Sequence, residues 1–208
     1  MIHQLHYITQ EIEGKTVSEK TEEACEGGVR WVQFRAKNIG FDKWKSQALE
    51  IQRICKKYNA KLIINDNVKI AKQINADGVH LGKNDMDADK AREFLGSKFI
   101  IGGTANSFED IQRLSNWKVD YIGLGPLRFT QTKKNLSPLI GMNGYFDIIQ
   151  MMRKENINIP VIGIGGVMLE DIDELLTIGL HGIAVSSAIT KAKNSTEEAR
   201  KFITTIEE

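Results

Sequence analysis

Eight short apolar runs recur along this chain of 208 residues, and they restrict the folds open to it more than any other feature. Each run is continuously apolar rather than alternating, which is typical of a strand buried on both faces of a sheet. The runs cover residues 5–8, 31–34, 62–64, 78–81, 99–101, 121–124, 161–164 and 182–185. The sequence therefore predicts eight buried strands.

Amphipathic helical patterns fill the intervals between these runs, and several have recognisable ends. Thr16 and Glu19 form a capping-box pattern, and the helix that follows should end at Gly27. Ser107 and Ser195 each stand three positions before an acidic residue, which predicts that they cap the next helices. Strands that alternate with helices pair in parallel through right-handed crossovers.

Eight such strand–helix units match a closed (β/α)₈ barrel of the α/β class. An open, doubly wound sheet is the alternative. Its dinucleotide-binding glycine pattern is broken, however, at Arg128 and Met168, where the third glycine should stand. The chain contains no linker, low-complexity tract or further repeat. We therefore expect residues 1–208 to form a single (β/α)₈ TIM-barrel domain.

The balanced charge of the chain argues against several classes of function. Its 28 Lys and Arg residues nearly match its 27 Asp and Glu residues, so no global field attracts nucleic acid or an anionic membrane. The first fifteen residues lack the apolar core of a signal peptide, and no apolar run reaches transmembrane length. Cys25 and Cys55 lie within helical patterns and are expected to be reduced. These features favour a cytoplasmic protein, and the four histidines lack the spacing of a zinc site.

The active site of such a barrel lies at the C-terminal ends of its strands, so the residues there are the first candidates. Gln33, Arg35 and Lys37 follow one another at the end of the second strand, and alternation sends all three to one side. If that side is the barrel interior, the two cations need anionic partners, because unpaired buried charge is costly. They would bind an anionic ligand or, alternatively, form salt bridges with neighbouring acids.

Two carboxylates stand just beyond neighbouring strands. Asp66 follows the third strand, next to Asn65, and Asp85 follows the fourth. Two carboxylates beside a cluster of Arg and Lys suit Mg²⁺, with a polyphosphate bridging the metal and the cations. Alternatively, Asp66 caps the helix that begins near Val68. His80, in the fourth strand, is expected to be a packed histidine rather than a catalytic one.

A loop with phosphate-binding side chains follows the sixth strand. It begins at Gly125-Pro126 and carries Thr130, Thr132, Lys133 and Lys134. Hydroxyls donate hydrogen bonds to phosphate oxygens and lysines neutralise their charge, so the loop is a candidate anion site. A solvated surface loop is the alternative.

The ends of the seventh and eighth strands form a second, mostly neutral candidate. Gly165 and Gly166 follow the seventh strand, and Ser186 and Ser187 follow the eighth. Exposed amides beside a helix start make the common phosphate site of barrels, and two plain turns are the alternative. Thr104, near the end of the fifth strand, either contacts a substrate or merely completes the strand.

Two anion sites of different character thus share one barrel mouth. The first is rich in charge and suits a diphosphate bound with a metal. The second is mostly neutral and suits a monophosphate. A metal-bound diphosphate opposite a phosphorylated acceptor predicts a transferase that releases pyrophosphate.

Together these segments resemble thiamine phosphate synthases over nearly the whole chain. The matching motifs are Val-Gln-Phe-Arg-Ala-Lys (32–37), Ile-Ile-Asn-Asp-Asn (63–67), Gly-Val-His-Leu-Gly-Lys-Asn-Asp-Met (78–86), Gly-Pro-Leu-Arg-Phe-Thr-Gln-Thr-Lys-Lys (125–134), Ile-Gly-Ile-Gly-Gly-Val (162–167) and Val-Ser-Ser-Ala-Ile (185–189). The resemblance implies that 4-amino-5-hydroxymethyl-2-methylpyrimidine diphosphate is coupled to 4-methyl-5-(2-phosphoethyl)thiazole. The products would be thiamine phosphate and pyrophosphate.

The resemblance also implies roles for individual residues. Mg²⁺ would lie at Asp66 and Asp85, and the pyrimidine would face Gln33 and Thr104. The residues that hold the diphosphate would be Arg35, Lys37, Asn65 and Lys133, with Arg35, Lys37 and Lys133 acting in catalysis. Thr130, Thr132, Gly165 and Ser187 would surround the thiazole phosphate, and Gly166 and Ser186 join this set by their positions at the strand ends.

Three positions depart from the usual family pattern. Ala36 stands for a frequent glutamate, Thr104 for a frequent serine, and Arg128-Phe129 for an aromatic–proline pair. Two alternative functions stay open: a thiazole tautomerase, which needs no diphosphate–metal site, and a non-catalytic barrel that binds thiazole phosphate to regulate a partner. We expect small-molecule substrates as partners, with no nucleic acid and no membrane, and leave a homo-oligomer open.

Overall fold

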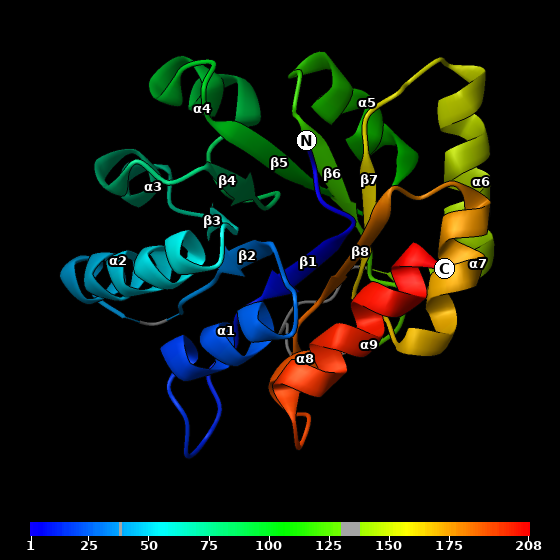
Figure 1. The fold of residues 1–208 in the computed structure, drawn as a ribbon. Helices are drawn as coiled ribbons and strands as arrows, with labels where there is room; N and C mark the ends of the chain where they lie inside the picture. Colours follow the sequence, from blue (N-terminus) through cyan, green and yellow to red (C-terminus); the bar gives the residue numbers. More distant parts are fainter. Residues whose placement is uncertain (38, 130–137) are drawn as a thin grey trace.

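The computed structural model describes residues 1–37, 39–129 and 138–208, and it confirms the predicted barrel (Figure 1). Parallel strands follow one another around the barrel in chain order, and the last strand pairs with the first. They are β1 (Leu5–Ile8), β2 (Trp31–Phe34), β3 (Lys61–Asn65), β4 (Gly78–Leu81), β5 (Ile100–Ala105), β6 (Tyr121–Leu124), β7 (Val161–Ile164) and β8 (Gly182–Val185). The sequence predicts the ends of all of them except β3 and β5, which are longer.

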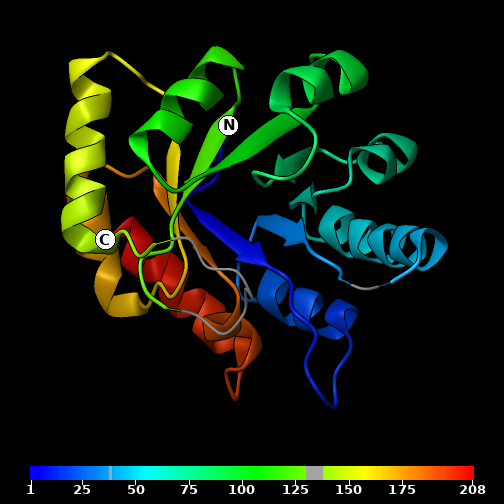
Figure 2. The same ribbon diagram turned by 180° about the vertical axis from the view of Figure 1, so that it is seen from behind.

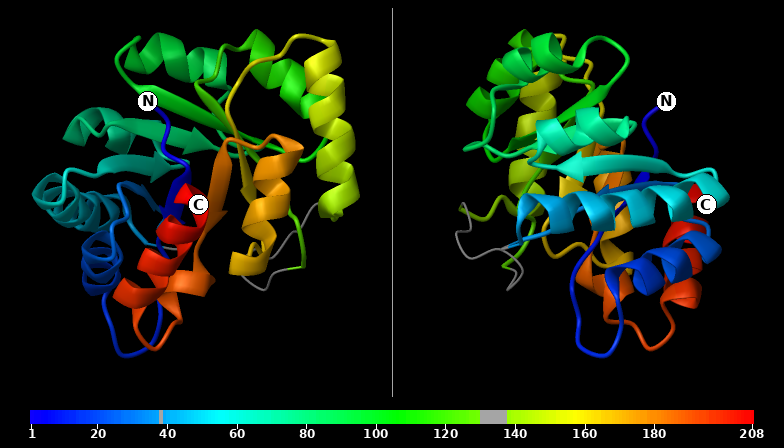
Figure 3. Two further views of the ribbon diagram at one scale, coloured as in Figure 1. Left: turned by 45° about the vertical axis from the view of Figure 1, so that its right-hand side comes forward. Right: turned by 90° about the vertical axis from the view of Figure 1, so that its left-hand side faces the viewer.

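Helices surround the strands on the outside (Figure 3). They are α1 (Val17–Glu26), α2 (Phe41–Lys57), α3 (Val68–Ile74), α4 (Ala88–Leu95), α5 (Phe108–Asn116), α6 (Gly141–Lys154), the 3₁₀ helix η1 (Leu169–Asp171), α7 (Ile172–Ile178), α8 (Ser187–Thr190) and α9 (Ser195–Glu207). Figure 2 shows α9 beside α1, so the first and last helices close the outer layer. None of the helices in the described ranges is long and apolar enough to cross a membrane.

Most of the predicted helix ends are confirmed. The Thr16 hydroxyl accepts the Glu19 N–H at 3.1 Å, the Glu19 carboxylate accepts the Thr16 N–H at 2.7 Å, and α1 ends before Gly27. Ser107 caps α5, because its hydroxyl accepts the Asp110 N–H at 3.3 Å. These contacts satisfy N–H groups that the first helical turn leaves without a partner.

The predicted cap of the last helix is wrong by one residue. Asn194 caps α9 by accepting the Glu197 N–H at 3.1 Å, and Ser195 is the first helical residue. The Ser195 hydroxyl is buried, where it donates to the Ile189 carbonyl at 2.9 Å and accepts from the Lys20 ammonium at 2.8 Å. Both residue types are good caps, and the buried partners decide which one has that role.

A small cluster of aromatic and aliphatic side chains fills the barrel interior, whereas the larger core lies between the strands and the helices. Trp31 and Tyr121 fill the interior and meet edge to face, with ring centroids 5.5 Å apart. Close neighbours explain why β5 continues through two glycines beyond its apolar run: Gly102 faces the interior, and a Cβ at Gly103 would lie 2.4 Å from the Leu114 side chain of α5. A Cβ at Gly102 would lie only 2.2 Å from the Tyr121 ring and 2.6 Å from Nδ1 of His80.

Candidate active site at the C-terminal ends of the strands

The predicted interior side of the second strand is confirmed. Trp31 and Gln33 both point into the barrel, and Nε2 of Gln33 donates to Oδ1 of Asn65 at 2.8 Å. Beyond the strand, Arg35 is half-buried, and burial lowers the pKa of its guanidinium while nearby Asp66 opposes that shift. Alternation thus brings an amide and a cation from β2 beside the end of β3, as the sequence predicts.

Thr9 is a supporting residue that the sequence analysis misses. Its buried hydroxyl accepts the Arg35 N–H at 3.0 Å, and its own N–H donates to the Gln33 carbonyl at 3.0 Å. The end of β1 therefore fixes the backbone on which Arg35 is presented. Lone threonines at strand ends are common, so no sequence signal distinguishes this one.

Asp66 and Asp85 lie side by side, which is the geometry predicted for a metal pair. Burial and the neighbouring Asp85 carboxylate raise the pKa of Asp66 well above its usual range, against the opposing influences of Arg35 and Asn65. Asp66 has a left-handed φ of 66°, and its N–H donates to the His80 carbonyl at 2.8 Å. Such a backbone is uncommon outside glycine, although Asp and Asn tolerate it best. It turns the carboxylate at the end of β3 toward β4.

The alternative role of Asp66 as a helix cap is not what the structure shows. Asn67 caps α3, because its side-chain oxygen accepts the Ile70 N–H at 3.0 Å. Asp85 is held from its own loop, where its carboxylate accepts the Gly82 N–H at 2.7 Å. The backbone of Asp66 and the carboxylate of Asp85 are thus each held by a backbone hydrogen bond.

Such a pair fits Mg²⁺. Burial and, after it, the charge of Asp85 raise the pKa of Asp66, and a divalent cation relieves the repulsion between the two carboxylates. In the described ranges no three His, Cys, Asp or Glu side chains gather around one point. Mg²⁺ suits a two-carboxylate site because it keeps several waters and shares substrate phosphates.

His80 connects the barrel interior to Thr104. Its Nδ1 lies 3.0 Å from the Tyr121 hydroxyl, and its Nε2 lies 3.0 Å from the Thr104 hydroxyl. Gly123 leaves room for the ring, because a Cβ there would lie 3.0 Å from Cε1 of His80. The sequence predicts a packed histidine, and the packing is confirmed. The link to a predicted substrate-facing residue is what the sequence does not reveal.

The loops after β6 and β7 run side by side. The Leu127 N–H donates to the Ile164 carbonyl at 3.0 Å, and the Arg128 N–H donates to the Gly165 carbonyl at 2.9 Å. Gly165 and Gly166 have φ values of +90° and +77°, and a Cβ at Gly165 would lie 2.6 Å from Cβ of Pro126. Glycine is therefore required here both by the left-handed backbone and by the neighbouring loop.

The second predicted anion site is brought together by adjacent strands. Ile164 of β7 pairs with Ala184 of β8, so the two glycines and the two serines follow their strands at the same end. Ser186 and Ser187 are half-buried, and the Ser186 hydroxyl donates to Oε1 of Gln10 at 3.3 Å. Tyr145 of α6 supports this end from outside, because its hydroxyl accepts the Ile164 N–H at 3.2 Å.

Several predicted site residues stand apart from this geometry. Lys37 is exposed in the loop beyond β2. Thr130, Thr132, Lys133 and Lys134 lie outside the described residues, so their predicted roles stay predictions.

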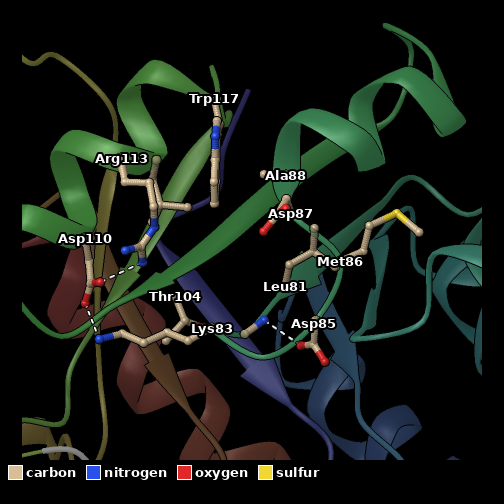
Figure 4. A pocket seen from close by; sticks show the side chains of 12 residues that line it. Leu81, Lys83, Asp85, Met86, Asp87, Ala88, Thr104, Asp110, Arg113 and Trp117 are labelled. Atoms are coloured by element: carbon tan, nitrogen blue, oxygen red, sulfur yellow. Dashed lines mark hydrogen bonds and ion pairs between the residues drawn. The ribbon is translucent and has the colours of Figure 1, made fainter.

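A cavity of about 440 Å³ adjoins the site between α4 and α5 (Figure 4). It meets the site at Asp85 and Thr104 and extends along β5 to Trp117. In its wall, the buried Asp110 carboxylate pairs with Lys83 and, at 2.7 Å, with Arg113. Asp85 and Asp87 also line the cavity, so three carboxylates face two cations, and the wall is not an additional anion site.

Comparison with known proteins identifies the family of this chain. A model of the thiamine monophosphate synthase family matches residues 5–189. The thiamine-phosphate synthase of Flavobacterium johnsoniae is 50% identical over 195 residues, which are 92% of this chain and 91% of that protein. That of Bacteroides thetaiotaomicron is 45% identical over 199 residues, 96% of this chain and 95% of its own. The solved thiamine phosphate pyrophosphorylase of Pyrococcus furiosus has a TM-score of 0.86 at 30% identity, covering 98% of this chain and 95% of that one. This chain belongs to the thiamine monophosphate synthase family.

Proposed function

We propose that this chain is a thiamine phosphate synthase that couples 4-amino-5-hydroxymethyl-2-methylpyrimidine diphosphate to 4-methyl-5-(2-phosphoethyl)thiazole. The observation that carries the proposal is the carboxylate pair Asp66–Asp85 beside Arg35, across the barrel mouth from the glycine and serine loops. A tautomerase needs no site for a diphosphate and a metal, and a regulatory barrel needs no charged site of any kind. The charged cluster therefore favours the synthase over both alternatives. The family membership supports the same choice.

In the proposed reaction, the bond from the exocyclic methylene carbon of the pyrimidine to the diphosphate oxygen breaks, and that carbon bonds to the thiazole nitrogen. The electron pair of the broken bond leaves with pyrophosphate, and the nitrogen supplies the pair for the new bond. The electron-rich aminopyrimidine stabilises positive charge at this carbon, so no protein nucleophile is required. The protein mainly neutralises the leaving group and aligns the two rings.

Each residue set has a task in this reaction. Arg35, Lys37, Asn65 and Lys133 hold the departing diphosphate, and Gln33 and Thr104 orient the pyrimidine. Asp66 and Asp85 hold Mg²⁺, which when bound supplies further positive charge to the leaving group. Thr130, Thr132, Gly165, Gly166, Ser186 and Ser187 surround the thiazole phosphate. The support for these tasks is the hydrogen bond between Gln33 and Asn65 and the Arg35–Asp66–Asp85 cluster.

One incubation tests the proposal against its alternatives. The pure protein is mixed with both substrates and Mg²⁺, and the products are separated. Thiamine phosphate and pyrophosphate that disappear on chelation are the expected result. An isomerised thiazole formed without the pyrimidine would identify a tautomerase, and binding without any product would identify a regulator.

The role of Lys133 has its own test. Lys133→Ala should lower turnover about 10²-fold or more, by analogy with the loss of one preorganised charge stabiliser. Lys134→Ala is the matched control, because this neighbour is expected to be ordinary solvated charge. Turnover of Lys133→Ala within a few-fold of wild type would refute the assignment.

We also propose a cytoplasmic location. Cys25 and Cys55 are free thiols in the core. Burial raises the pKa of Cys25 to about 12, which keeps this thiol protonated and unreactive. Reduced, inert cysteines are typical of a reducing compartment.

A further inference from the structure

Arg128 joins the loop after β6 to the segment after β7 through its side chain. Its guanidinium binds both carboxylate oxygens of Asp171, with Nη2 at 2.5 Å from Oδ1. Its Nη1 also donates to the Gly166 carbonyl at 2.9 Å. These three hydrogen bonds connect the Arg128 side chain to one carboxylate and to the second glycine of the proposed phosphate loop.

Asp171 is buried, with 4% of its side chain exposed, at the end of η1. Its carboxylate also accepts the Met168 N–H at 2.8 Å. A buried carboxylate needs a cationic partner, and the fork of an arginine meets both of its oxygens at once. Arg128, Gly166, Met168 and Asp171 therefore form one connected unit, which we call the β7 clamp.

The β7 clamp fixes the loop that contains Gly165 and Gly166. The backbone hydrogen bond from Arg128 to Gly165 holds one side of this loop, and the guanidinium holds the next carbonyl along. Two glycines with left-handed φ values would otherwise sample many conformations, because glycine has the greatest backbone freedom. The β7 clamp restricts this loop to one conformation, which its two glycines alone would not do.

We infer that Arg128 and Asp171 are positioning residues for the phosphorylated acceptor: they hold the Gly165–Gly166 loop in the conformation that receives its phosphate. This inference rests on the proposed assignment of that loop to the thiazole phosphate. The inference predicts an effect on the binding of only one of the two substrates. Loss of the clamp weakens binding of the thiazole phosphate and leaves binding of the pyrimidine diphosphate, on the other side of the mouth, unchanged.

The chain offers a matched control at the opposite end of the barrel. Arg92 donates to Asp120 at 2.6 Å and to the Phe99 carbonyl at 2.5 Å, and Asp120 also accepts the Ile101 N–H at 2.7 Å. This unit likewise joins an Arg to an Asp and to a backbone carbonyl, although through one carboxylate oxygen instead of two, and it precedes β5 and β6 instead of following them. A general effect of losing an Arg–Asp unit should therefore appear in Arg92→Met as well.

The test measures both Michaelis constants in Arg128→Met, Asp171→Asn and the double variant. Asp171→Asn keeps an acceptor for the Met168 N–H and removes the charge. We expect each single variant to raise the KM for thiazole phosphate about 10-fold or more, because a small displacement of positioning groups is costly. The double variant should be no worse than the worse single variant, since either change opens the same clamp. The KM for the pyrimidine diphosphate should stay within about 2-fold in all three.

Each alternative outcome is distinct. An unchanged KM for thiazole phosphate overturns the inference, and so does an equal rise in Arg92→Met. Additive effects in the double variant also overturn it, since they would mean that Arg128 contacts the ligand directly. Arg128→Lys keeps the charge without the fork, so an intermediate KM is expected, and this variant serves if Arg128→Met does not fold.

Ser187→Ala separates the clamp from the site that it serves. If Ser187→Ala raises the KM for thiazole phosphate and Arg128→Met does not, the positioning role of the β7 clamp is refuted and the proposed phosphate site is supported. If neither variant changes that KM, the proposed phosphate site itself is wrong, and the inference falls with it. Formation of thiamine phosphate by the wild-type protein reports independently on the proposed function.

Discussion

At the scale of single residues, the state of His80 decides what Thr104 can offer a substrate. Burial raises the pKa of Tyr121 far above its usual range. We propose that the Tyr121 hydroxyl donates its hydrogen bond to Nδ1 of His80, in which case Nε2 carries the ring proton and donates to the Thr104 hydroxyl. With Thr104 in its proposed role beside the pyrimidine, its own hydrogen is then left for an acceptor on that ring. A serine at this position would do the same, which explains why Thr104 is an acceptable departure from the family pattern.

Tyr121→Phe tests this relay of hydrogen bonds. Without the tyrosine donor, the preference for one tautomer of His80 is lost, and we expect about 1 kcal/mol less binding of the pyrimidine diphosphate. That corresponds to about a fivefold higher KM for this substrate. Tyr7→Phe is the control, because Tyr7 is an equally buried tyrosine whose hydroxyl lies 2.8 Å from that of Thr190. Equal changes in the two variants would contradict the proposed role of His80.

At the scale of elements, the ends of β6 and β7 form one structural unit. Tyr145 of α6 binds the end of β7, and the Arg128–Asp171 ion pair connects the loops beyond. The Arg128 side chain holds the pKa of Asp171 below its usual value through their hydrogen bonds. An acid with a lowered pKa stabilises the folded state at pH values above its unfolded pKa, and that contribution is lost as the pH falls through the folded pKa.

The stability of Asp171→Asn should therefore depend on pH in a defined way. At pH 7 we expect its Tm to be lower than that of the wild type by about 5 °C, since a charge-assisted pair contributes about 2 kcal/mol. The gap should begin to narrow once the pH falls below about 4, where Asp171 of the unfolded wild type becomes protonated, and it should narrow further as the pH falls through the lower pKa of the folded state. Thermal melts of both proteins from pH 3 to pH 8 give this comparison. A gap that is constant with pH would show that the ion pair contributes nothing.

The elements differ in how far the sequence predicts them. Strands with continuous apolar runs are predicted residue by residue, as in β2 and β8. β5 is underestimated because Gly102 and Gly103 carry no strand signal, and the need for them arises from Tyr121 on the neighbouring strand and from Leu114 of α5. Arg128 and Asp171 stand 43 positions apart, so their pairing follows from the register of two loops and from no local motif. The Asp66–Asp85 pair was predictable because strand ends meet at one mouth by topology alone.

At the scale of the whole molecule, the residues that stabilise the fold and the residues proposed to react lie in different parts of the barrel. The aliphatic layer between strands and helices stabilises the fold, whereas the mouth keeps two carboxylates whose charges repel. Repulsion of this kind lowers the stability of the metal-free protein, and the barrel tolerates it because the core is large. Two neighbouring carboxylates thus favour the binding of a cation, and they lower the stability of the fold when no cation is bound.

Asp85→Asn should raise the stability of the metal-free protein and lower its turnover with Mg²⁺. Removal of one of two like charges should raise the Tm without metal by about 2–4 °C, which corresponds to about 1 kcal/mol. Turnover with Mg²⁺ should fall about 10²-fold. Mg²⁺ should raise the Tm of the wild type and leave that of the variant unchanged. Asp87→Asn is the control, because Asp87 pairs with Lys90 on α4 outside the carboxylate pair. A metal-free Tm below that of the wild type would contradict the repulsion.

The aromatic interior of the barrel also gives the molecule an optical property. Trp31 has no solvent exposure, stacks on His6 at 4.3 Å between ring centroids, and meets Tyr121 edge to face. In the described part of the chain, its Nε1–H has no hydrogen-bond partner. Tyr121 in turn contacts His80, and His80 contacts Thr104 at the mouth. The indole is thus a fluorophore enclosed in the barrel interior, two side chains below Thr104, which we propose to face the pyrimidine. We expect its emission to report the occupation of the barrel mouth from beneath, without a label and without a change at the surface.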